Sequence, residues 1–271
     1  MAVAPDPVPN VRDAYSPSEI AHRVETSGVG KAQLSVLQTL TLAVLAGAFI
    51  AFGAMFYALV VTNHGLGYGI GRTLGGIAFS LGLILVVVAG AELFTGNNLI
   101  VMAWADRKIT GPALLRNWGL VYVGNFAGAA ATALIVHWSG TLDMADGAQR
   151  VAAIRIAEAK MALPFAEAFF RGLLCNVLVC LAVWLSFASH TVTGKILAII
   201  FPITAFVALG FEHSVANMYF LPIGILSGLN GGAGAIINGV LSNLVPVTLG
   251  NIVGGSMFVA LVYWIIYLRH R

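Results

Sequence analysis

Two glutamates occupy matching settings inside apolar stretches of this chain, 120 residues apart. Glu92 lies in AGAELFTGNN and Glu212 lies in LGFEHSVAN, and each follows a long apolar run. A carboxylate at membrane depth costs roughly 3 kcal/mol on insertion scales, so it is rare without a role. Two of them in corresponding places of two halves predict an inverted-repeat transport protein with broken helices near the midplane.

Other polar residues inside the apolar stretches are few and gather around these glutamates. The first site has Thr95, Asn97 and Asn98, the second has His213, Ser214 and Asn217, and Asn176 lies midway along another apolar segment. The apolar candidates for a lining are Phe79, Leu83, Leu93, Phe94, Phe206 and Phe211. A broken helix exposes free N–H groups, and its positive N-terminal end favours an anion. The combination suits a small solute.

Two interpretations stay open for the ionisable groups. His213 is either a satisfied core residue or a functional one, and its neighbours at a helix break favour function. Glu92 and Glu212 either serve the permeating solute or only cap free N–H groups at their breaks. We expect no metal and no cofactor, because no second His or Cys lies at ligand spacing to His213. Cys175 and Cys180 point in different directions on one helix and read as core residues.

The composition is that of an integral membrane protein. Of 271 residues, 59% are hydrophobic and 9% are charged, whereas soluble domains carry about 25% charged residues. The net charge of +3 reflects a few basic loop residues, so nucleic acid is not an expected partner. The expected partner is the lipid bilayer.

Six apolar segments predict an all-α membrane protein: about 34–61, 73–105, 117–138, 165–187, 196–226 and 246–268. A helix crosses the hydrocarbon core in about 20 residues, and 73–105 would run to roughly 50 Å as one helix. The second and fifth segments are therefore expected to break at their polar clusters. We expect two inverted repeats of three helices each, at about 34–138 and 165–268, in a single channel domain spanning 34–271.

A second internal match supports the repeat. Gly124-Asn125-Phe126-Ala127-Gly128 and Gly250-Asn251-Ile252-Val253-Gly254 lie 126 residues apart, and a unit of three segments inverts its second copy in the membrane. The glycines favour close helix packing. The role of the asparagines stays open, since a buried Asn must find partners.

The polar segment 1–33 is expected to be cytoplasmic. It has no apolar signal region, and SPSEIAHRV predicts an amphipathic helix capped by Ser16 or Ser18 that lies along the membrane surface. Nine basic residues would then be cytoplasmic and five external, which favours both termini in the cytoplasm. The external loop 139–164 is the exception and predicts a short amphipathic helix.

Four motifs in order resemble the formate/nitrite transporter family: AELFTGN at 91–97, LLCN at 173–176, GFEHSVANM at 210–218 and GNIVGG at 250–255. The resemblance implies an aquaporin-like fold with the second and fifth helices interrupted, in a homopentamer of the cytoplasmic (inner) membrane. Each protomer would carry its own pore.

The resemblance also implies roles for single residues. Leu83 with Phe206 would form a cytoplasmic constriction, and Phe79 with Leu93 a periplasmic one. Between them, His213, Thr95 and Asn176 would form a central polar site. Lys160 matches a lysine of the external vestibule, while Glu92, Glu212 and Asn217 would support the breaks.

The expected function is passage of a small monovalent anion, with formate first, nitrite second, and hydrosulfide or a short carboxylate third. Two alternatives come from other classes. An aquaporin-type channel for neutral solutes would have an NPA-like pair at the breaks, where this chain has ELFTGNN and FEHSVAN. A membrane-embedded hydrolase would need a nucleophile, a base and an orienting group, and Ser214 beside His213 does not supply them. We therefore expect no enzyme.

Overall fold

The computed structural model describes residues 14–63 and 65–269, and over these residues the fold is helical apart from one isolated bridge between Ala14 and Ser189. The α-helices are α1 (Pro17–Gln33), α2 (Val36–Val61), α3 (Tyr68–Leu85), α4 (Val101–Ala105), α5 (Gly111–Trp138), α6 (Ala148–Met161), α7 (Phe165–Ala188), α8 (Val192–Ala208), α9 (Ser214–Leu226), α10 (Ala233–Gly255) and α11 (Val262–Tyr267). The short π and 3-10 turns are η1 (Val86–Gly90), η2 (Gly96–Ile100), η3 (Thr141–Asp143) and η4 (Ser256–Leu261).

Five helical runs are long and apolar enough to cross a membrane: α2, α3 with η1, α5, α7, and α10 through α11. Two shorter apolar helices, α8 and α9, follow one another at the expected fifth segment. The expectation of an all-α, multi-pass membrane protein is thus confirmed. One boundary was wrong: the last segment was expected at 246, but α10 begins at Ala233, because Ile236, Ile237 and Val240 continue its apolar side through the intervening glycines.

The ends of the helices follow local sequence. At α1, the Ser16 side chain accepts from Glu19 N while the Glu19 carboxylate accepts from Ser16 N, a capping box. Ser35 and Gln38 form the same box at α2. Of the two caps considered for the first helix, Ser16 is therefore the one used.

Both expected breaks are present. The first follows Gly90, whose φ is +84°, and residues 91–93 are not helical. The second follows α8 at Gly210, whose φ is +76°, and residues 211–213 are not helical. Glycine adopts this left-handed conformation without the steric cost that a Cβ brings, so it is suited to turning the chain out of a helix.

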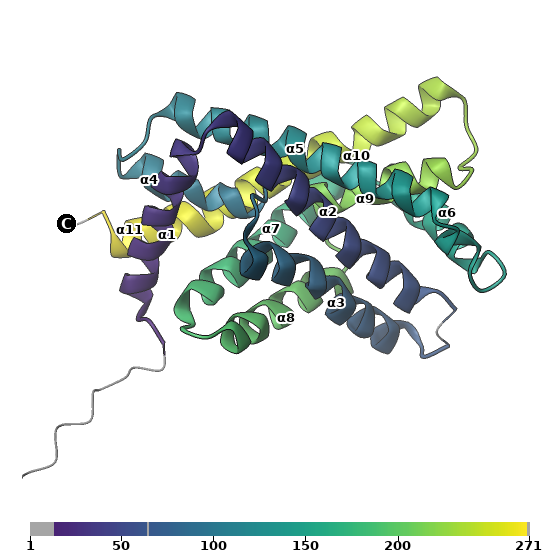
Figure 1. The fold of residues 1–271 in the computed structure, drawn as a ribbon, viewed down its shortest axis with the longest axis horizontal. Coiled ribbons are helices and arrows are strands. Elements are labelled where there is room, and N and C mark those ends of the chain that lie inside the picture. Colours follow the sequence, from purple (N-terminus) through teal and green to yellow (C-terminus); the bar gives the residue numbers. More distant parts are fainter. Residues whose placement is uncertain (1–13, 64, 270–271) are drawn as a thin grey trace, which may run out of the picture.

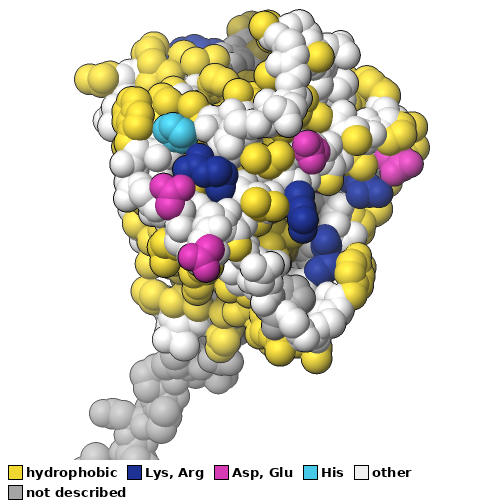
Figure 2. All heavy atoms as spheres, turned by 90° about the vertical axis from the view of Figure 1, so that its right-hand side faces the viewer, with side chains coloured by type: hydrophobic (Ala, Val, Ile, Leu, Met, Phe, Trp, Pro, Cys, Tyr) yellow, Lys and Arg dark blue, Asp and Glu magenta, His cyan; other side chains and the backbone are white. Residues whose placement is uncertain are grey.

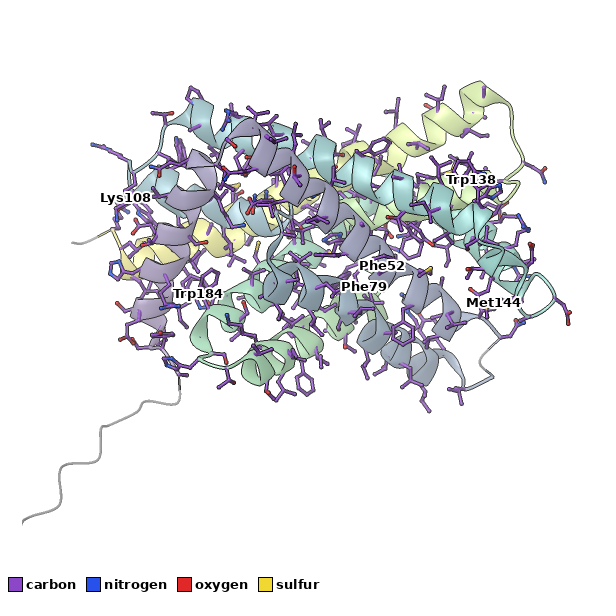
Figure 3. All side chains as sticks on the ribbon, viewed as in Figure 1. Phe52, Phe79, Lys108, Trp138, Met144 and Trp184 are labelled. Carbon is purple, nitrogen blue, oxygen red and sulfur yellow. The ribbon has the colours of Figure 1, made fainter. Side chains whose placement is uncertain are left out.

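Helices α1, α4 and α11 lie at one end of the molecule, and α6 lies at the other (Figure 1). The long helices run between these ends, with α2 packed along α5 and α7 along α10. The GNxxG glycines allow this packing, since a Cβ at Gly128 would clash with the backbone of Val44 and one at Gly254 with that of Leu173. Phe79 lies near the middle of the molecule, whereas Lys108 and Trp138 mark its two ends (Figure 3).

The two short end helices pack on protein. In α1, the apolar residues Ile20, Ala21 and Val24 are buried against a cluster that includes α4 residues. The expected helix over 139–164 is α6, and Ala153 and Ala157 on it are buried. The α1 face that we expected to rest on lipid is therefore covered by the protein itself, and residues 1–13 lie outside the described part of the chain.

Candidate permeation site

The carboxylate of Glu92 is bound by two side chains, Lys31 of α1 and Asn97 of η2. Lys31 Nζ of α1 donates to Glu92 Oε1 at 2.6 Å and to Asn97 Oδ1 at 3.0 Å. Asn97 Nδ2 donates to Glu92 Oε2 at 2.7 Å and to Asn117 Oδ1 at 3.0 Å. Asn117 Nδ2 in turn donates to the Lys31 carbonyl at 3.2 Å. The network joins α1 and α5 to the first break.

The same network recurs at the second break. Lys160 Nζ of α6 donates to Glu212 Oε1 at 2.9 Å and Oε2 at 3.1 Å. Asn217 Nδ2 donates to Glu212 Oε2 and to Asn243 Oδ1, each at 2.7 Å. Asn243 Nδ2 donates to the Lys160 carbonyl at 2.9 Å. Lys160, Glu212, Asn217 and Asn243 thus repeat the first network except at the lysine, which binds both oxygens of Glu212 and not the asparagine oxygen.

The asparagines of the two GNxxG runs support the backbone of the breaks. Asn125 Oδ1 accepts from Phe94 N at 2.9 Å, and its Nδ2 donates to the Ala43 and Glu92 carbonyls. Asn251 Oδ1 accepts from Ser214 N at 2.9 Å, and its Nδ2 donates to the Gly172 and Glu212 carbonyls. Each amide thus binds two backbone groups of its break and one carbonyl of a neighbouring helix, α2 for Asn125 and α7 for Asn251.

One of the two interpretations of the glutamates can therefore be corrected. Their carboxylates bind Lys and Asn side chains and do not cap backbone N–H groups; Asn125 and Asn251 do that. A carboxylate makes stronger, charge-assisted hydrogen bonds with an ammonium group than with backbone N–H groups alone.

His213 is buried at the start of α9, with 3% of its surface exposed. Its Nδ1 accepts from Ala216 N at 3.1 Å and so caps the helix. The neutral ring therefore carries its proton on Nε2, which lies 2.9 Å from Thr95 Oγ1. A second proton on Nδ1 would face the Ala216 N–H at the positive end of α9, so the geometry favours the neutral ring.

Thr95 and Asn176 are fully buried beside the first break. With His213 Nε2–H donating to it, the Thr95 hydroxyl keeps its own proton for another acceptor. Asn176 Nδ2 lies within hydrogen-bond distance of three protein acceptors, namely the Thr95 carbonyl, Asn98 Oδ1 and the Asn251 carbonyl. The amide nitrogen of Asn176 thus links the first break to α10.

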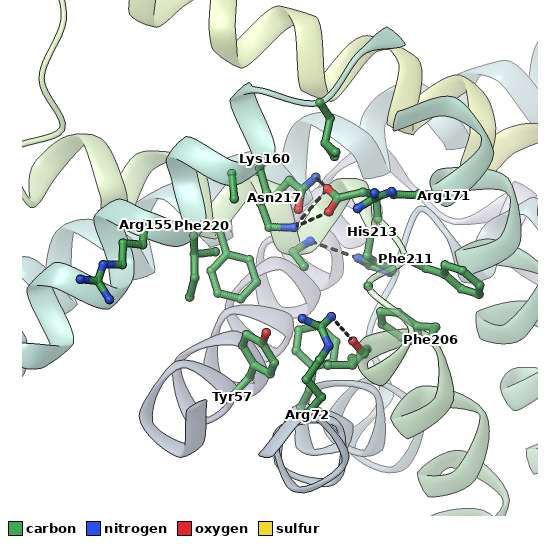
Figure 4. Close-up of a pocket in the computed structure, with 18 residues that line it drawn as sticks. Tyr57, Arg72, Arg155, Lys160, Arg171, Phe206, Phe211, His213, Asn217 and Phe220 are labelled. Atoms are coloured by element: carbon green, nitrogen blue, oxygen red, sulfur yellow. Dashed lines mark hydrogen bonds and ion pairs between the residues drawn. The ribbon is translucent and has the colours of Figure 1, made fainter. Parts of the chain in front are cut away.

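Two cavities approach this centre from opposite sides. The α6 pocket, of about 290 Å³, contains Lys160, Glu212 and His213. The α1 pocket, of about 430 Å³, contains Lys31, Glu92 and Gly96. Figure 4 shows the α6 pocket, with Lys160 and Asn217 on one side and Tyr57 and Arg72 on the other.

The four constriction residues are divided between the two pockets. Phe79 packs edge to face on Phe206, with ring centroids 5.6 Å apart, and both line the α6 pocket. Leu83 and Leu93 both line the α1 pocket. The expected pairs, Leu83 with Phe206 and Phe79 with Leu93, stay predictions, and the contact that the structure shows is Phe79 with Phe206. Phe79 and Leu83 lie on the same face of α3, one turn apart along its axis, and they line the α6 pocket and the α1 pocket respectively.

Three residues of the two networks, Lys31, Asn117 and Asn243, escaped the sequence analysis. Lys31 lies 129 residues before Lys160, and Asn117 lies 126 before Asn243. That spacing was available in the sequence, because it matches the GNxxG offset closely, but neither pair stands in a shared motif.

Comparison with known proteins agrees with this geometry. The family model described as "Formate/nitrite transporter" matches residues 18–265. The chain belongs to the formate/nitrite transporter family. It is 40% identical to the formate channel FocA of Escherichia coli (strain K12), over 97% of this chain and 98% of that protein. It is 41% identical to a probable formate transporter of Methanothermobacter thermautotrophicus, over 94% and 97%.

Two solved structures are similar across the fold. One, described as a pentameric formate channel with formate bound, has a TM-score of 0.78 at 40% identity and covers 86% of this chain and 98% of its own. The other, described as an FNT family ion channel, has a TM-score of 0.83 at 30% identity, covering 92% and 99%. This membership in a family of channels and transporters excludes the hydrolase alternative and the aquaporin alternative.

Proposed function

We propose that this protein is a formate channel whose pore runs through each protomer between the α6 pocket and the α1 pocket. The observation that carries the proposal is the buried pair of His213 Nε2 and Thr95 Oγ1, 2.9 Å apart, beside the Phe79–Phe206 contact. An anion leaving water for an apolar passage needs hydrogen-bond donors. The Thr95 hydroxyl, which accepts from His213 Nε2 and keeps its own proton, supplies one.

The hydrophobic residues divide the passage. Phe79 with Phe206 forms the constriction toward the α6 pocket, and Leu83 with Leu93 forms the one toward the α1 pocket. Apolar constrictions of this kind gate by excluding water. Lys160 and Lys31 each hold a positive charge at the wide side of a constriction, with Glu212 and Glu92 as their counter-charges.

The two halves form an inverted repeat with an aquaporin-like arrangement. The support is the repetition of the lysine–glutamate pair and of the asparagine contacts with the glutamate, the second asparagine and the lysine carbonyl in the second half. The protein lies in a bacterial inner membrane with both termini in the cytoplasm. Helix α1 is then on the cytoplasmic side and α6 on the external side. The assembly is a homopentamer, as in the similar formate channel structure.

The test is flux into proteoliposomes that contain the purified protein, with formate, nitrite, hydrosulfide and lactate offered in one competition series. Formate should be carried fastest. A protein that carries nitrite or hydrosulfide faster than formate would move the assignment to that anion within the same family. Flux of none of the four would refute the proposal.

The constrictions are tested by size selectivity. Leu83→Ala should widen the passage and raise lactate flux relative to formate, and Phe79→Ala should do the same at the other constriction. Leu249→Ala, a change of the same type at an exposed position of α10, is the matched control. Unchanged selectivity in both variants would place the narrow points elsewhere.

A further inference from the structure

Arg72 of α3 reaches across to the end of α8. Its Nε donates to the Ala208 carbonyl at 2.7 Å, and its Nη2 donates to the Val207 carbonyl at 2.9 Å. The guanidinium also lies 5.5 Å from the Tyr68 ring centroid, one turn back on α3. Arg72 is half-buried and lines the α6 pocket, where Figure 4 shows its head group close to Phe206.

The end of α8 leaves carbonyls for Arg72 to bind. Phe211 N donates to the Phe206 carbonyl at 3.0 Å, and Gly210 N donates to the Val207 carbonyl at 3.1 Å. These two bonds form a Schellman motif around the left-handed Gly210. They leave the next carbonyl, that of Ala208, without a backbone donor from the turn. Arg72 Nε provides the donor.

This carbonyl end matters because of where it points. The C-terminus of a helix carries the equivalent of roughly half a negative charge. Here it lies beside Phe206, at the wall of the pocket through which an anion would enter. Uncompensated, it would repel that anion at the narrowest approach. The planar, permanently charged guanidinium cancels it with two directed bonds.

The first break has no counterpart of Arg72 at the matching position. By the 120-residue spacing of the two breaks, the position that matches Arg72 is Val192, whose side chain cannot donate a hydrogen bond. The pockets also differ in charge. The α6 pocket is lined by Arg72, Arg155, Lys160 and Arg171 against Glu212, whereas the α1 pocket has Lys31 against Glu92. Lys and Arg side chains are exposed across the middle of the α6 end of the molecule (Figure 2).

We propose that Arg72 is a specificity-determining residue for anion entry, which masks the carbonyl end of α8 and gives the α6 pocket its excess positive charge. The inference rests on the proposed function in that the permeant is an anion, but it does not depend on which anion is carried. It also makes the two pockets unequal in charge, so that the α6 pocket attracts anions more strongly than the α1 pocket.

The experiment compares Arg72→Lys, Arg72→Gln and Arg72→Met with the wild type in proteoliposomes. Arg150→Gln is the control, because Arg150 pairs with Asp143 and lines neither pocket. Removing the charge and both bonds in Arg72→Met should lower the flux of the carried anion about tenfold, from half a charge acting over a few ångströms. Arg72→Lys should keep most of the flux, and Arg72→Gln should fall between.

A second readout separates charge from shape. Raising the ionic strength with an impermeant salt should slow the wild type and Arg150→Gln, and should change Arg72→Met much less, because screening acts on a charge that the variant lacks. Thermal unfolding in detergent identifies any variant that is misfolded. If Arg72→Met is itself unstable, the comparison of folded Arg72→Gln with Arg72→Lys decides the question.

The outcomes distinguish the two proposals. Wild-type flux that is matched by Arg72→Met overturns the role of Arg72 and leaves the channel function intact. Folded Arg72→Lys as slow as Arg72→Met also overturns it, since charge would then be irrelevant. A wild-type protein that carries none of the tested anions overturns the proposed function, and the inference with it.

Discussion

At the scale of the residue, His213 combines a structural contact with a candidate functional one. Its Nδ1 caps α9, and its Nε2 meets the Thr95 hydroxyl. The two contacts can be separated, because Asn also caps helices well and carries no imidazole.

We expect His213→Asn to keep the fold and lose most formate flux, together with its dependence on pH. His213→Phe should lose the flux and also the cap, at a cost of about 1 kcal/mol in stability. Flux across a pH series and thermal unfolding together measure both effects. A folded His213→Asn variant with the wild-type flux and pH profile would make His213 a packing residue.

The break asparagines give a second prediction. Asn125→Leu and Asn251→Leu each remove three hydrogen bonds from buried backbone groups, so each should lower stability by about 2–4 kcal/mol. Thermal unfolding in detergent is the measurement. Ser242→Ala, which removes a single bond to the Gly239 carbonyl, should change little. Equal stability of all three variants would contradict the role of the asparagines.

Single residues were the least complete part of the sequence-based prediction. The glutamates were found because a carboxylate within an apolar run is conspicuous. Lys31 was not found, because it lies 61 residues from its partner Glu92 in a polar segment where lysine is ordinary. The contact of Phe79 with Phe206 was not predicted, because it depends on how α3 and α8 cross, and no spacing within one helix contains that information.

At the scale of the element, α1 is an integral part of the fold. It contributes Lys31 to the first break, as α6 contributes Lys160 to the second. Removing one partner of a buried pair leaves an uncompensated charge, which typically costs 3–5 kcal/mol.

Lys31→Met should therefore destabilise the protein strongly, and Lys31→Met combined with Glu92→Gln should recover part of the loss. Thermal unfolding of the two single variants and the double variant completes the cycle. Strictly additive effects would show that the ion pair carries no coupling.

A second contact of α1 responds to pH. Glu25 is buried, and Lys108 Nζ lies 2.6 Å from its Oε2 and 3.2 Å from an oxygen of Asp106. Burial raises the pKa of Glu25 above its ordinary 4.5, whereas a hydrogen bond with Glu25 lowers the pKa of Asp106 below its ordinary 3.8. The other groups that face Glu25 and Asp106 are His22 and the Trp264 indole.

The sign follows from linkage. The contribution of Glu25 to the docking of α1 is complete below pH 4.5 and is lost as the pH rises through its raised pKa. The contribution of Asp106 is lost as the pH falls below 3.8. Protection of α1 from proteolysis should thus be greatest in mild acid and weaken toward neutral pH. Glu25→Gln imitates the protonated carboxyl, so its protection should no longer decline; a decline as steep as in the wild type would refute this.

The elements themselves were largely predictable. Both breaks follow from apolar runs too long for one crossing, interrupted by a polar cluster. The beginning of α10 was missed because its first turns contain Gly and Asn residues, which are poor helix formers in isolation. Packing of Ile236 and Val240 against a cluster that includes Ala157 of α6 offsets that local preference.

At the scale of the whole molecule, the apolar surface requires covering by lipid and by other protomers. Large exposed side chains include Phe52, Phe56, Phe201 and Phe258. We expect native mass spectrometry in mild detergent to give a pentamer, since closed rings of identical subunits bury the same surfaces on every copy. A stable monomer or dimer under those conditions would contradict the assembly.

The two halves of the molecule match closely in the side chains that hold their breaks, but they differ at the centre. By the 120-residue spacing, His213 matches Leu93 and Ser214 matches Phe94. The backbone N–H groups of Ser214 and Phe94 bind the equivalent asparagines, Asn251 and Asn125. Two identical copies of one half would carry two imidazoles or two leucines at these matching positions. A chain that contains both halves can carry an imidazole at one position and a leucine at the other. The single polypeptide thus allows an asymmetric centre between two halves with matching hydrogen-bond networks.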